Sequence, residues 1–332
     1  MDVFPIGERA HWSRDPLSGD IVDGCVFGRG SVDMKCGTTA SIFAYLYLHA
    51  MRDRLPGRVT LTVVSDEETG GRWGTGYLLD HHPELLGDCV LNGEPSSKHT
   101  VRFAEKGIFW LRLRVRTPGA HGAYPHLSAS ATRIAARAVV ALEKLEALPP
   151  EMPEAIVRTL ARDDVRAAME RGLGKGAVET ASRLTLNIGM LHGGVKVNML
   201  PGECLIEADI RLPVGLTRAR VMDEVRALLR DYPEVEIEEP PPTVDATASD
   251  PDHPMLRIIQ DNAEAITGVR PTPTVSLGGS DCRFWRARGV PAYIYGCLPD
   301  RMGAPDERVP VEEFLDVVRV HTLSAHDWLV RR

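Results

Sequence analysis

The stretch Arg58-Val-Thr-Leu-Thr-Val-Val-Ser65, followed directly by Asp66-Glu67-Glu68-Thr69-Gly70-Gly71, is the clearest indication of the fold. Its first part is rich in β-branched residues and predicts a strand, and its second part is an acidic loop with glycines. Residues 36–55 predict a helix that ends at Pro56-Gly57, and a short helix is predicted near residues 75–82. Strands that alternate with helices are typical of a mostly parallel sheet covered on both faces.

The middle of the chain has a different pattern, in which strands and helices follow the order β-α-β-β-α-β. Residues 203–212 alternate cleanly between apolar and polar side chains, as a strand with one buried face requires. This order matches the split βαβ, or ferredoxin-like, unit, with a helical insertion at 151–171. The predicted elements are strands at 108–116, 184–191, 203–212 and 235–238, and helices at 128–148 and 217–231.

After the proline run at residues 240–242 the alternating pattern returns. We therefore predict an α/β fold with a mostly parallel sheet, interrupted by an inserted α+β domain. The α/β domain comprises residues 1–106 and 244–332, and the inserted domain comprises residues 107–243. The last predicted elements are helices at 254–267, from 281, and at 311–330, with strands at 89–91, 272–276 and 292–295.

Composition excludes several classes of protein. The 332 residues include 39 basic and 46 acidic side chains, a net charge of −7 without a basic cluster, so we expect neither nucleic acid nor a membrane as partner. No apolar run approaches the ~20 residues that a membrane span needs, and the first residues do not resemble a signal sequence. The six cysteines form no CxxC pair, which indicates reduced thiols and a cytoplasmic protein.

Carboxylates follow several of the predicted strands or begin a helix. Asp33 lies in a glycine loop before a helix, Glu67 and Glu68 follow the strand 58–65, and Glu94 follows the strand 89–91. Taken singly, these are ordinary turns or a solvated acidic loop. Taken together, they are expected to converge at one edge of the sheet, where open α/β sheets bind ligands. Such an oxygen-rich cluster suits a divalent metal with a spare carboxylate as general base.

Three further segments contain candidate residues with weaker signals. His121 lies in a loop of the inserted domain, where a lone histidine is more often structural. Arg211 lies on the polar face of its strand, where simple solvation explains a charge. The turn at 278–283, with Gly279, Ser280 and Arg283, is flexible, and its backbone N–H groups suit a carboxylate ligand.

These segments, in this order, resemble the family of metal-dependent aminoacylases and peptidases that contains succinyl-diaminopimelate desuccinylase, acetylornithine deacetylase and carboxypeptidase G. The resemblance implies a metal-binding hydrolase domain at 1–106 and 244–332 and a lid and dimerisation domain at 107–243. NGEPSS, AYPHL and GGSDCRF are most similar to the desuccinylase branch. The matching stretches are MDVFP, FGRGSVDMKCG, VVSDEETGG, NGEPSS, PGAHGAYPH, GGVKVNMLPGE, ADIR, GGSDCRF and PDERV.

The resemblance also implies a role for each matching residue. Asp33 is expected to bridge two metal ions, zinc with cobalt or manganese as alternatives, and Glu68 and Glu94 to bind one ion each. Glu67 is expected to be the general base, and Asp2 to orient a histidine ligand. His121 is expected to stabilise the oxyanion from a partner subunit's lid. The expected substrate-binding residues are Asn198, Arg211, Gly279, Ser280 and Arg283.

The sequence departs from the family pattern at two metal ligands. The family motif places a histidine directly before the residue that corresponds to Met1, and this sequence begins after that histidine. The helix and strands that precede the motif in the family are also absent from this sequence. We expect that a misplaced start codon or a fragment explains both. A second histidine is expected four residues before Glu307, where this chain has Gly303. Sites made only of carboxylates are weaker for zinc than sites with imidazole. Asp300, Asp306 and Glu307 are alternatives for the missing ligands.

The sequence therefore predicts a metal-dependent hydrolase that cleaves the amide of an N-acyl amino acid or a similar small amide that bears a carboxylate. A carboxypeptidase or dipeptidase on the same scaffold is one alternative. An inactive relative is the other, because two histidines are absent. We expect a small-molecule substrate and a homodimer formed through the inserted domain.

Overall fold

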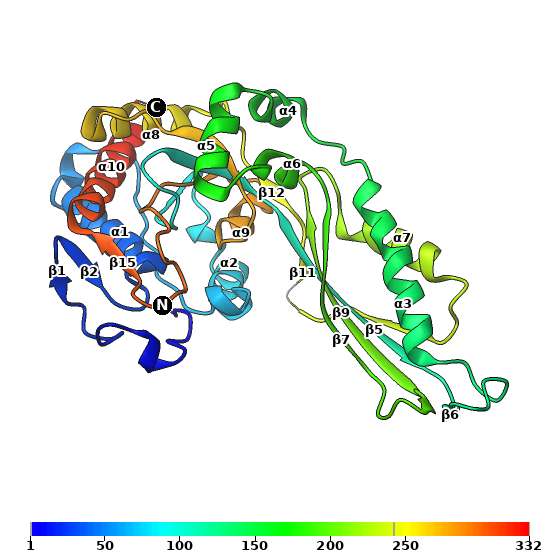
Figure 1. Ribbon diagram of the computed structural model, residues 1–332. Helices are drawn as coiled ribbons and strands as arrows, with labels where there is room; N and C mark the ends of the chain where they lie inside the picture. The colour runs from blue at the N-terminus through cyan, green and yellow to red at the C-terminus, as the bar shows by residue number, and fades with distance from the viewer. Residues whose placement is uncertain (1, 242, 332) are drawn as a thin grey trace.

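The computed structural model describes residues 2–241 and 243–331, and its two larger sheets lie in different parts of an elongated molecule (Figure 1). We call them the long sheet, in the order β10-β5-β9-β7 with β11 beside β5, and the mixed sheet, in the order β12-β4-β14-β3 with β13 beside β4. The helices are α1 (Cys36–Ala50), α2 (Tyr77–His81), α3 (Ala131–Leu142), α4 (Glu154–Leu160), α5 (Asp163–Leu173), α6 (Ala177–Ser182), α7 (Arg218–Leu229), α8 (Pro254–Thr267), α9 (Cys282–Arg286) and α10 (Val311–Val330).

The long sheet has the predicted β-α-β-β-α-β order. β9 pairs antiparallel with β5 over ten residues, from Glu203 opposite Arg116 to Leu212 opposite Gly107. The apolar face of β9, including Ile206 and Ile210, is fully buried in a core that α3 and α7 share. The strands of this sheet are β5 (Gly107–Arg116), β7 (Thr185–Gly193), β9 (Glu203–Leu212), β10 (Val235–Glu238) and β11 (Thr243–Val244), and β6 (Ala120–His121) pairs separately with β8 (Met199–Leu200).

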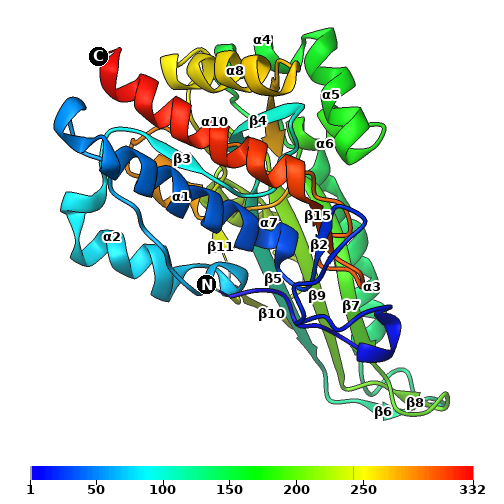
Figure 2. The same cartoon turned by 90° about the vertical axis from the view of Figure 1, so that its left-hand side faces the viewer.

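The mixed sheet is shorter and combines both strand directions. β13 runs parallel to β4, β14 runs parallel to β3, and β12 is antiparallel to β4. Helices α1, α10 and α8 lie side by side across it (Figure 2). The strands are β3 (Val90–Asn92), β4 (Thr100–Glu105), β12 (Thr247–Ala248), β13 (Thr272–Ser276) and β14 (Ala292–Ile294), and a small separate sheet contains β1 (Ile21–Val22), β2 (Cys25–Phe27) and β15 (Arg308–Pro310).

The prediction of a strand at residues 58–65 is wrong. This segment joins no strand pair within residues 2–241 and 243–331. The β-branched sequence favours an extended backbone, but a strand needs a neighbour with which to exchange hydrogen bonds. Strand β4 was not predicted at all. The mixed α/β class is confirmed.

The helical insertion also forms, as α4, α5 and α6, but these helices share their apolar core with α8 and β13 rather than with the long sheet. The division into residues 1–106 with 244–332 and residues 107–243 stays a prediction. No helix among the described residues is both long and apolar enough to cross a membrane.

Candidate active site

Five of the predicted site residues line one cavity beside the mixed sheet. They are Asp2, Asp33, Glu67, Glu68 and Glu94. They come from three loops and from the start of the chain, and all lie at the end of the cavity where β3 and the segment 58–65 finish. The four carboxylates expected from the strand ends and the helix start, Asp33, Glu67, Glu68 and Glu94, all line this cavity, although the strand predicted at 58–65 does not form; their roles stay a prediction.

Asp33 is held by a buried ion pair beneath its loop. Glu307 accepts hydrogen bonds from the backbone amides of Val32 (2.9 Å) and Asp33 (3.1 Å). The same carboxylate is paired with Arg29, and both side chains are almost inaccessible to solvent. Arg29 also donates to the carbonyl of Gly303 (3.0 Å) and lies over the ring of Trp12. This arrangement fixes the backbone that presents Asp33.

The acidic loop is positioned from both sides. Its Glu68 amide donates to Oδ2 of Asp2 (3.1 Å), so the start of the chain contacts the loop. Glu67 Oε1 lies 3.6 Å from Nη1 of Arg283. Asp281, which also lines the cavity, accepts a hydrogen bond from the hydroxyl of Thr75 (2.6 Å). Glu67 therefore lies between a fixed cation and a second buried carboxylate.

Glu94 is placed by a close approach of two backbones. Gly37, in the first turn of α1, and Gly93 touch so tightly that a Cβ on Gly37 would lie 2.0 Å from the Gly93 carbonyl oxygen. Only glycine at both positions allows α1 to start against the end of β3. Glu94 itself is 9% exposed. The glycines in the two sequence motifs thus bring Glu94 next to the Asp33 loop.

The carboxylates repel one another in a site that is shielded from water. Burial, with Glu307 and Asp2 nearby, raises the pKa of Asp33 to about 6. Burial and Asp281 raise the pKa of Glu67 to about 8, and burial and Asp33 raise that of Glu68 to about 7. Burial first, and then Asp33, raises the pKa of Glu94 well above its usual range. Desolvation and like charge both favour the protonated form.

The carboxylates fit a divalent cation in charge, because a cation among them would relieve this repulsion. They do not form a finished coordination shell: in the part of the chain that the structure describes, no group of three or more His, Cys, Asp or Glu side chains is arranged to hold a metal ion. Gly303 supplies no ligand. Glu307 is committed to Arg29, and Asp306 accepts hydrogen bonds from Ser13.

Two predicted residues lie far from this cavity within the same chain. His121 is in β6 and Asn198 is in the loop before β8, at the distal end of the long sheet (Figure 1). Both side chains are exposed, and the carbonyl of Asn198 accepts a hydrogen bond from Gly122. His121 and Asn198 are therefore not part of the cavity within one chain, and the contribution of His121 from a partner subunit, which the resemblance implies, stays a prediction.

The other predicted substrate-binding residues have partners of their own. Arg211 forms an ion pair with Asp209 on the same strand, at 2.9 Å. The hydroxyl of Ser280 is buried and donates to Glu105 (2.6 Å), and Arg283 donates to the carbonyl of Ser280 (2.6 Å). These two hydrogen bonds fix the loop at Gly279. The backbone groups of the loop, rather than the Ser280 and Arg283 side chains, are therefore available to bind a ligand.

Two residues at the site, Asp281 and Arg102, have no role among the sequence-based predictions. Asp281 faces Glu67, and burial raises its pKa to about 6; its position inside the GGSDCRF motif was an available signal. Arg102, on β4, is a half-buried cation that opposes part of the rise in the pKa of Asp33 and of Glu94. It lies on the strand that was not predicted, so the sequence offered no placement for it.

A model of the peptidase family M20/M25/M40 matches residues 1–327. The chain belongs to this family. It is 30% identical over 338 residues to the succinyl-diaminopimelate desuccinylase of Cereibacter sphaeroides strain KD131, covering 98% of this chain and 81% of that protein. It is 27% identical over 328 residues to the protein of the same name from Wolinella succinogenes, covering 96% and 80% of the two chains.

Solved structures of other proteins share the fold. A metallo-carboxypeptidase from Sulfolobus solfataricus matches with a TM-score of 0.80 at 16% identity, covering 97% of this chain and 82% of the other. Human carnosine dipeptidase 1 matches with a TM-score of 0.70 at 15% identity, covering 97% and 78%. At these identities the likeness shows the fold alone. The family membership predicted from the motifs, and with it the class of metal-dependent amide hydrolase, is confirmed.

Proposed function

We propose that this M20-family chain hydrolyses the amide bond of an N-acyl amino acid, or of a similar small amide that bears a carboxylate, with Glu67 as the general base. The observation that supports the proposal most directly is that Asp2, Asp33, Glu67, Glu68 and Glu94 line one cavity. The desuccinylase relatives make an N-succinyl amino acid the first substrate to test. We also propose a cytoplasmic location.

In this proposal Asp33, Glu68 and Glu94 would hold the divalent metal, which is two zinc ions, with cobalt or manganese as alternatives. Asp2 would support the site through its hydrogen bond with the Glu68 amide. A bound cation supplies Lewis acidity, which polarises the amide carbonyl and lowers the pKa of water. Glu67 takes the proton of the attacking water and returns it to the leaving amine. Arg283, at 3.6 Å, orients the Glu67 carboxylate.

The proposal is tested by Glu67→Gln, which keeps the size of the side chain and removes the base. Because a positioned base contributes on the order of 10²–10⁴-fold, we expect kcat to fall by about that factor. Glu84→Gln, at an exposed position outside the cavity, is the matched control and should retain full activity. Turnover of N-succinyl and N-acetyl amino acids and of dipeptides is measured with zinc, cobalt or manganese added. Unchanged turnover in Glu67→Gln would refute the base assignment.

A second candidate is a non-catalytic relative that binds an amino-acid-like ligand. The lack of a three-ligand metal group in the described residues, with glycine at position 303, favours it. The two candidates differ in metal content per chain, measured by mass spectrometry after dialysis. Bound metal that is lost in Asp33→Asn supports the hydrolase. Absence of bound metal together with absence of turnover supports the non-catalytic relative.

We further propose that two copies pair along β7, which has a strand on one side only among the described residues. Met190 and Leu191 on this strand are 45% and 52% exposed, and an edge strand with apolar side chains is a template for pairing. Light scattering at micromolar concentration should give twice the mass of the chain. Met190→Lys should give the monomer, whereas a monomer in the unchanged protein would exclude His121 from the site.

A further inference from the structure

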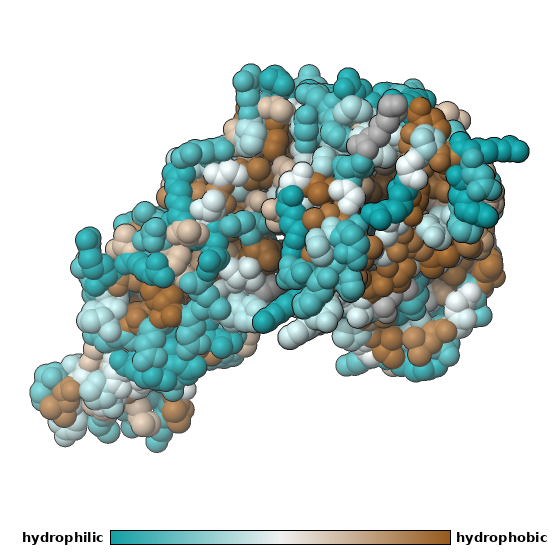
Figure 3. Space-filling model, turned by 180° about the vertical axis from the view of Figure 1, so that it is seen from behind, coloured by the Kyte–Doolittle hydropathy of each residue, from teal (hydrophilic) through white to brown (hydrophobic). Residues whose placement is uncertain are grey.

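Two buried charged side chains lie where the chain passes from the mixed sheet into the long sheet. β4 ends at Glu105 and β5 begins at Gly107, and the return path lies beside them, because Thr247 of β12 pairs with Glu105. Seen from behind, the surface is hollowed between the parts of the molecule that contain these sheets (Figure 3). Glu105 is 1% exposed and Lys106 is 2% exposed. This crossing therefore contains an acid and a base that the proposed reaction does not use.

The two neighbours are bound to opposite sides of the crossing. The Lys106 ammonium donates to the carbonyls of Thr180 (2.7 Å) and Arg183 (2.8 Å), between α6 and the start of β7 in the long sheet. The Glu105 carboxylate instead accepts a hydrogen bond from the hydroxyl of Ser280 (2.6 Å), in the loop before α9. Lys106 thus holds the long-sheet side, whereas Glu105 holds a loop beside the candidate active site.

The Glu105 carboxylate is built into a buried polar cluster. Besides Ser280, it accepts a long hydrogen bond from the hydroxyl of Thr247 (3.4 Å) and lies 3.4 Å from Nη1 of Arg286. The Arg286 side chain is inaccessible to solvent, and this Nη1 has no hydrogen-bond partner among the described residues. A buried ion pair is a weak source of stability, because desolvation offsets its attraction. What Glu105 does supply is a fixed acceptor for Ser280.

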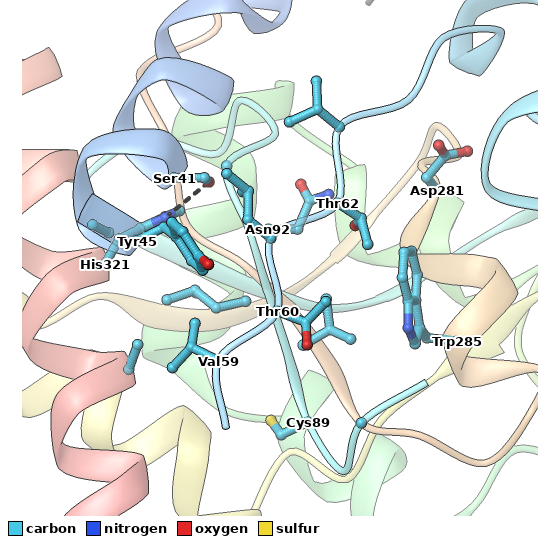
Figure 4. Close-up of a pocket in the computed structure, with 18 of the residues that line it drawn as sticks. Ser41, Tyr45, Val59, Thr60, Thr62, Cys89, Asn92, Asp281, Trp285 and His321 are labelled. Atoms are coloured by element: carbon cyan, nitrogen blue, oxygen red, sulfur yellow. Dashed lines mark hydrogen bonds between the residues drawn. The ribbon is translucent and has the colours of Figure 1, made fainter. Parts of the chain in front are cut away.

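The Ser280 peptide decides where the charge next to Glu67 lies. Within residues 2–241 and 243–331, the Arg283 guanidinium donates to one acceptor, the Ser280 carbonyl, at 2.6 Å from Nη1. The same Nη1 lies 3.6 Å from Oε1 of Glu67. Asp281 and Trp285, on either side of Arg283 in the sequence, lie on the same side of the cavity (Figure 4). A displaced Ser280 would therefore move the cation that faces Glu67.

We propose that Glu105 is a positioning residue for the general base: it holds Ser280, and through the Ser280 carbonyl it holds the Arg283 guanidinium beside Glu67. The kinetic consequence rests on the proposed function, whereas the structural consequence does not. Glu105 does not line the cavity, so it acts on the base and not on the substrate. Because a misplacement of about 1 Å costs on the order of 10²-fold in rate, the effect belongs in kcat.

The structural test measures hydrogen–deuterium exchange of the amides of 280–284, with those of β9 as an internal reference. We expect exchange to become at least tenfold faster in Glu105→Ala and to stay near the original rate in Glu105→Gln, whose amide oxygen still accepts from Ser280. Lys106→Met is the matched control, because it changes an equally buried charge on the opposite side of the crossing. It should leave 280–284 unchanged. Unchanged exchange in Glu105→Ala, or equal acceleration in Lys106→Met, would overturn the proposal.

A second variant keeps the structural test decisive if Glu105→Ala does not fold, because that change leaves Arg286 buried without its anion. Ser280→Ala removes the same hydrogen bond and leaves the pair of Glu105 with Arg286 in place. We expect exchange of 281–284 to become at least tenfold faster in this variant too. Unchanged exchange would show that the loop is held without Glu105.

The kinetic test separates a positioning role from a general loss of structure. Glu105→Ala should lower kcat by about 10–100-fold with KM within about threefold, and Glu105→Gln should recover most of the loss. In the Glu67→Gln background, Glu105→Ala should cause no further loss, because both changes act on the same group. A further loss there, or an effect confined to KM, would overturn the role in positioning the base.

The two proposals fail in different ways. Absence of turnover in the unmodified chain would count against the proposed function, and the exchange result would still decide whether Glu105 holds the loop. Full turnover with unchanged exchange and unchanged kcat in Glu105→Ala would leave the proposed function intact and overturn this inference alone.

Discussion

The long sheet and the mixed sheet differ in how completely their strands are surrounded. β9 of the long sheet has a ladder on each side and a helical layer on its apolar face, and Ile206 and Ile210 are fully buried. The segment 58–65 has an equally strand-like sequence, yet within the described residues it pairs with no strand, and Val63 is half-exposed. The difference shows that alternation and β-branching favour an extended backbone. A β-strand forms only where a neighbouring strand exchanges hydrogen bonds with that backbone.

Near the mixed sheet, the loops of the candidate site and the cavity beside them also differ in the contacts that they make. The loops are tied by specific polar contacts, such as those from Glu307 to the Val32 and Asp33 amides. The rest of the cavity is lined mainly by apolar and small polar side chains. The carboxylates of the candidate site are therefore held by polar contacts on one side and face a more apolar cavity wall on the other.

The largest expected effect is in the local stability of the two regions. Amides of β5 and β9 should exchange only through global opening, which costs about 5–15 kcal/mol, whereas amides of 59–64 should be nearly unprotected. The ratio of exchange rates should exceed about 10⁴, measured by hydrogen–deuterium exchange of the unmodified chain. Similar protection in both segments would break the comparison.

The next effect concerns the buried ion pair under Asp33. Arg29→Met leaves the Glu307 carboxylate buried without its cation, and the loss should be about 3–5 kcal/mol of unfolding free energy. Adding Glu307→Gln removes the stranded charge and keeps an acceptor for the Val32 amide, so part of the loss should be recovered. Urea unfolding of both variants measures this. A loss below 1 kcal/mol in the single variant would mean that the pair contributes little to holding the loop.

The two strands can then be compared by truncating one side chain in each. Leu113, opposite Ile206 in the long sheet, is 1% exposed, and Leu113→Ala should cost about 2–5 kcal/mol. Val63→Ala, in the unpaired segment, should change stability by less than about 0.5 kcal/mol. Both are measured by urea unfolding. Equal costs would mean that residues 59–64 are packed as tightly as a true strand.

A smaller effect, dependent on pH, is expected from His321, which lines the cavity. Burial lowers its pKa to about 4, and its Nε2 donates to the Tyr295 carbonyl (2.7 Å). The folded pKa is below the unfolded value of 6.5, so the unfolded chain binds the proton first as pH falls. Stability from neutral His321 is complete above pH 6.5 and should be lost between 6.5 and 4, by roughly 3 kcal/mol.

Asp33 and Glu68 have raised pKa values in the folded chain, so the folded chain binds their protons first as pH falls. These carboxylates therefore make the free energy of unfolding rise as pH falls, opposite to His321. The effect of His321 is therefore measured as the difference between the unmodified chain and His321→Gln at each pH. That difference should shrink as pH falls from 6.5 to 4. A difference independent of pH would show that His321 titrates normally in the folded chain.

Most elements could be predicted from local pattern. The bounds predicted for β9, α8, β13 and α10 agree with the structure, because each has a full period of buried residues and clear end signals. Strand β4 was missed because the sequence from Thr100 to Glu105 mixes charged and apolar residues without alternation. Glu105 forms an ion pair with Arg286 (3.4 Å), and the charge of Arg102 acts on Asp33 and Glu94. Arg286 and Asp33 are distant in the chain from these residues, so the sequence does not reveal them as partners.

The sequence by itself determined the family, the class of chemistry and the carboxylates that meet, because those depend on residue types at fixed spacings after strand ends. Only the tertiary structure decided which backbone groups found partners. A hydrogen-bond ladder and a closed apolar core are made between segments distant in the chain, so residues 58–65 have the sequence of a strand and still pair with no strand among the described residues.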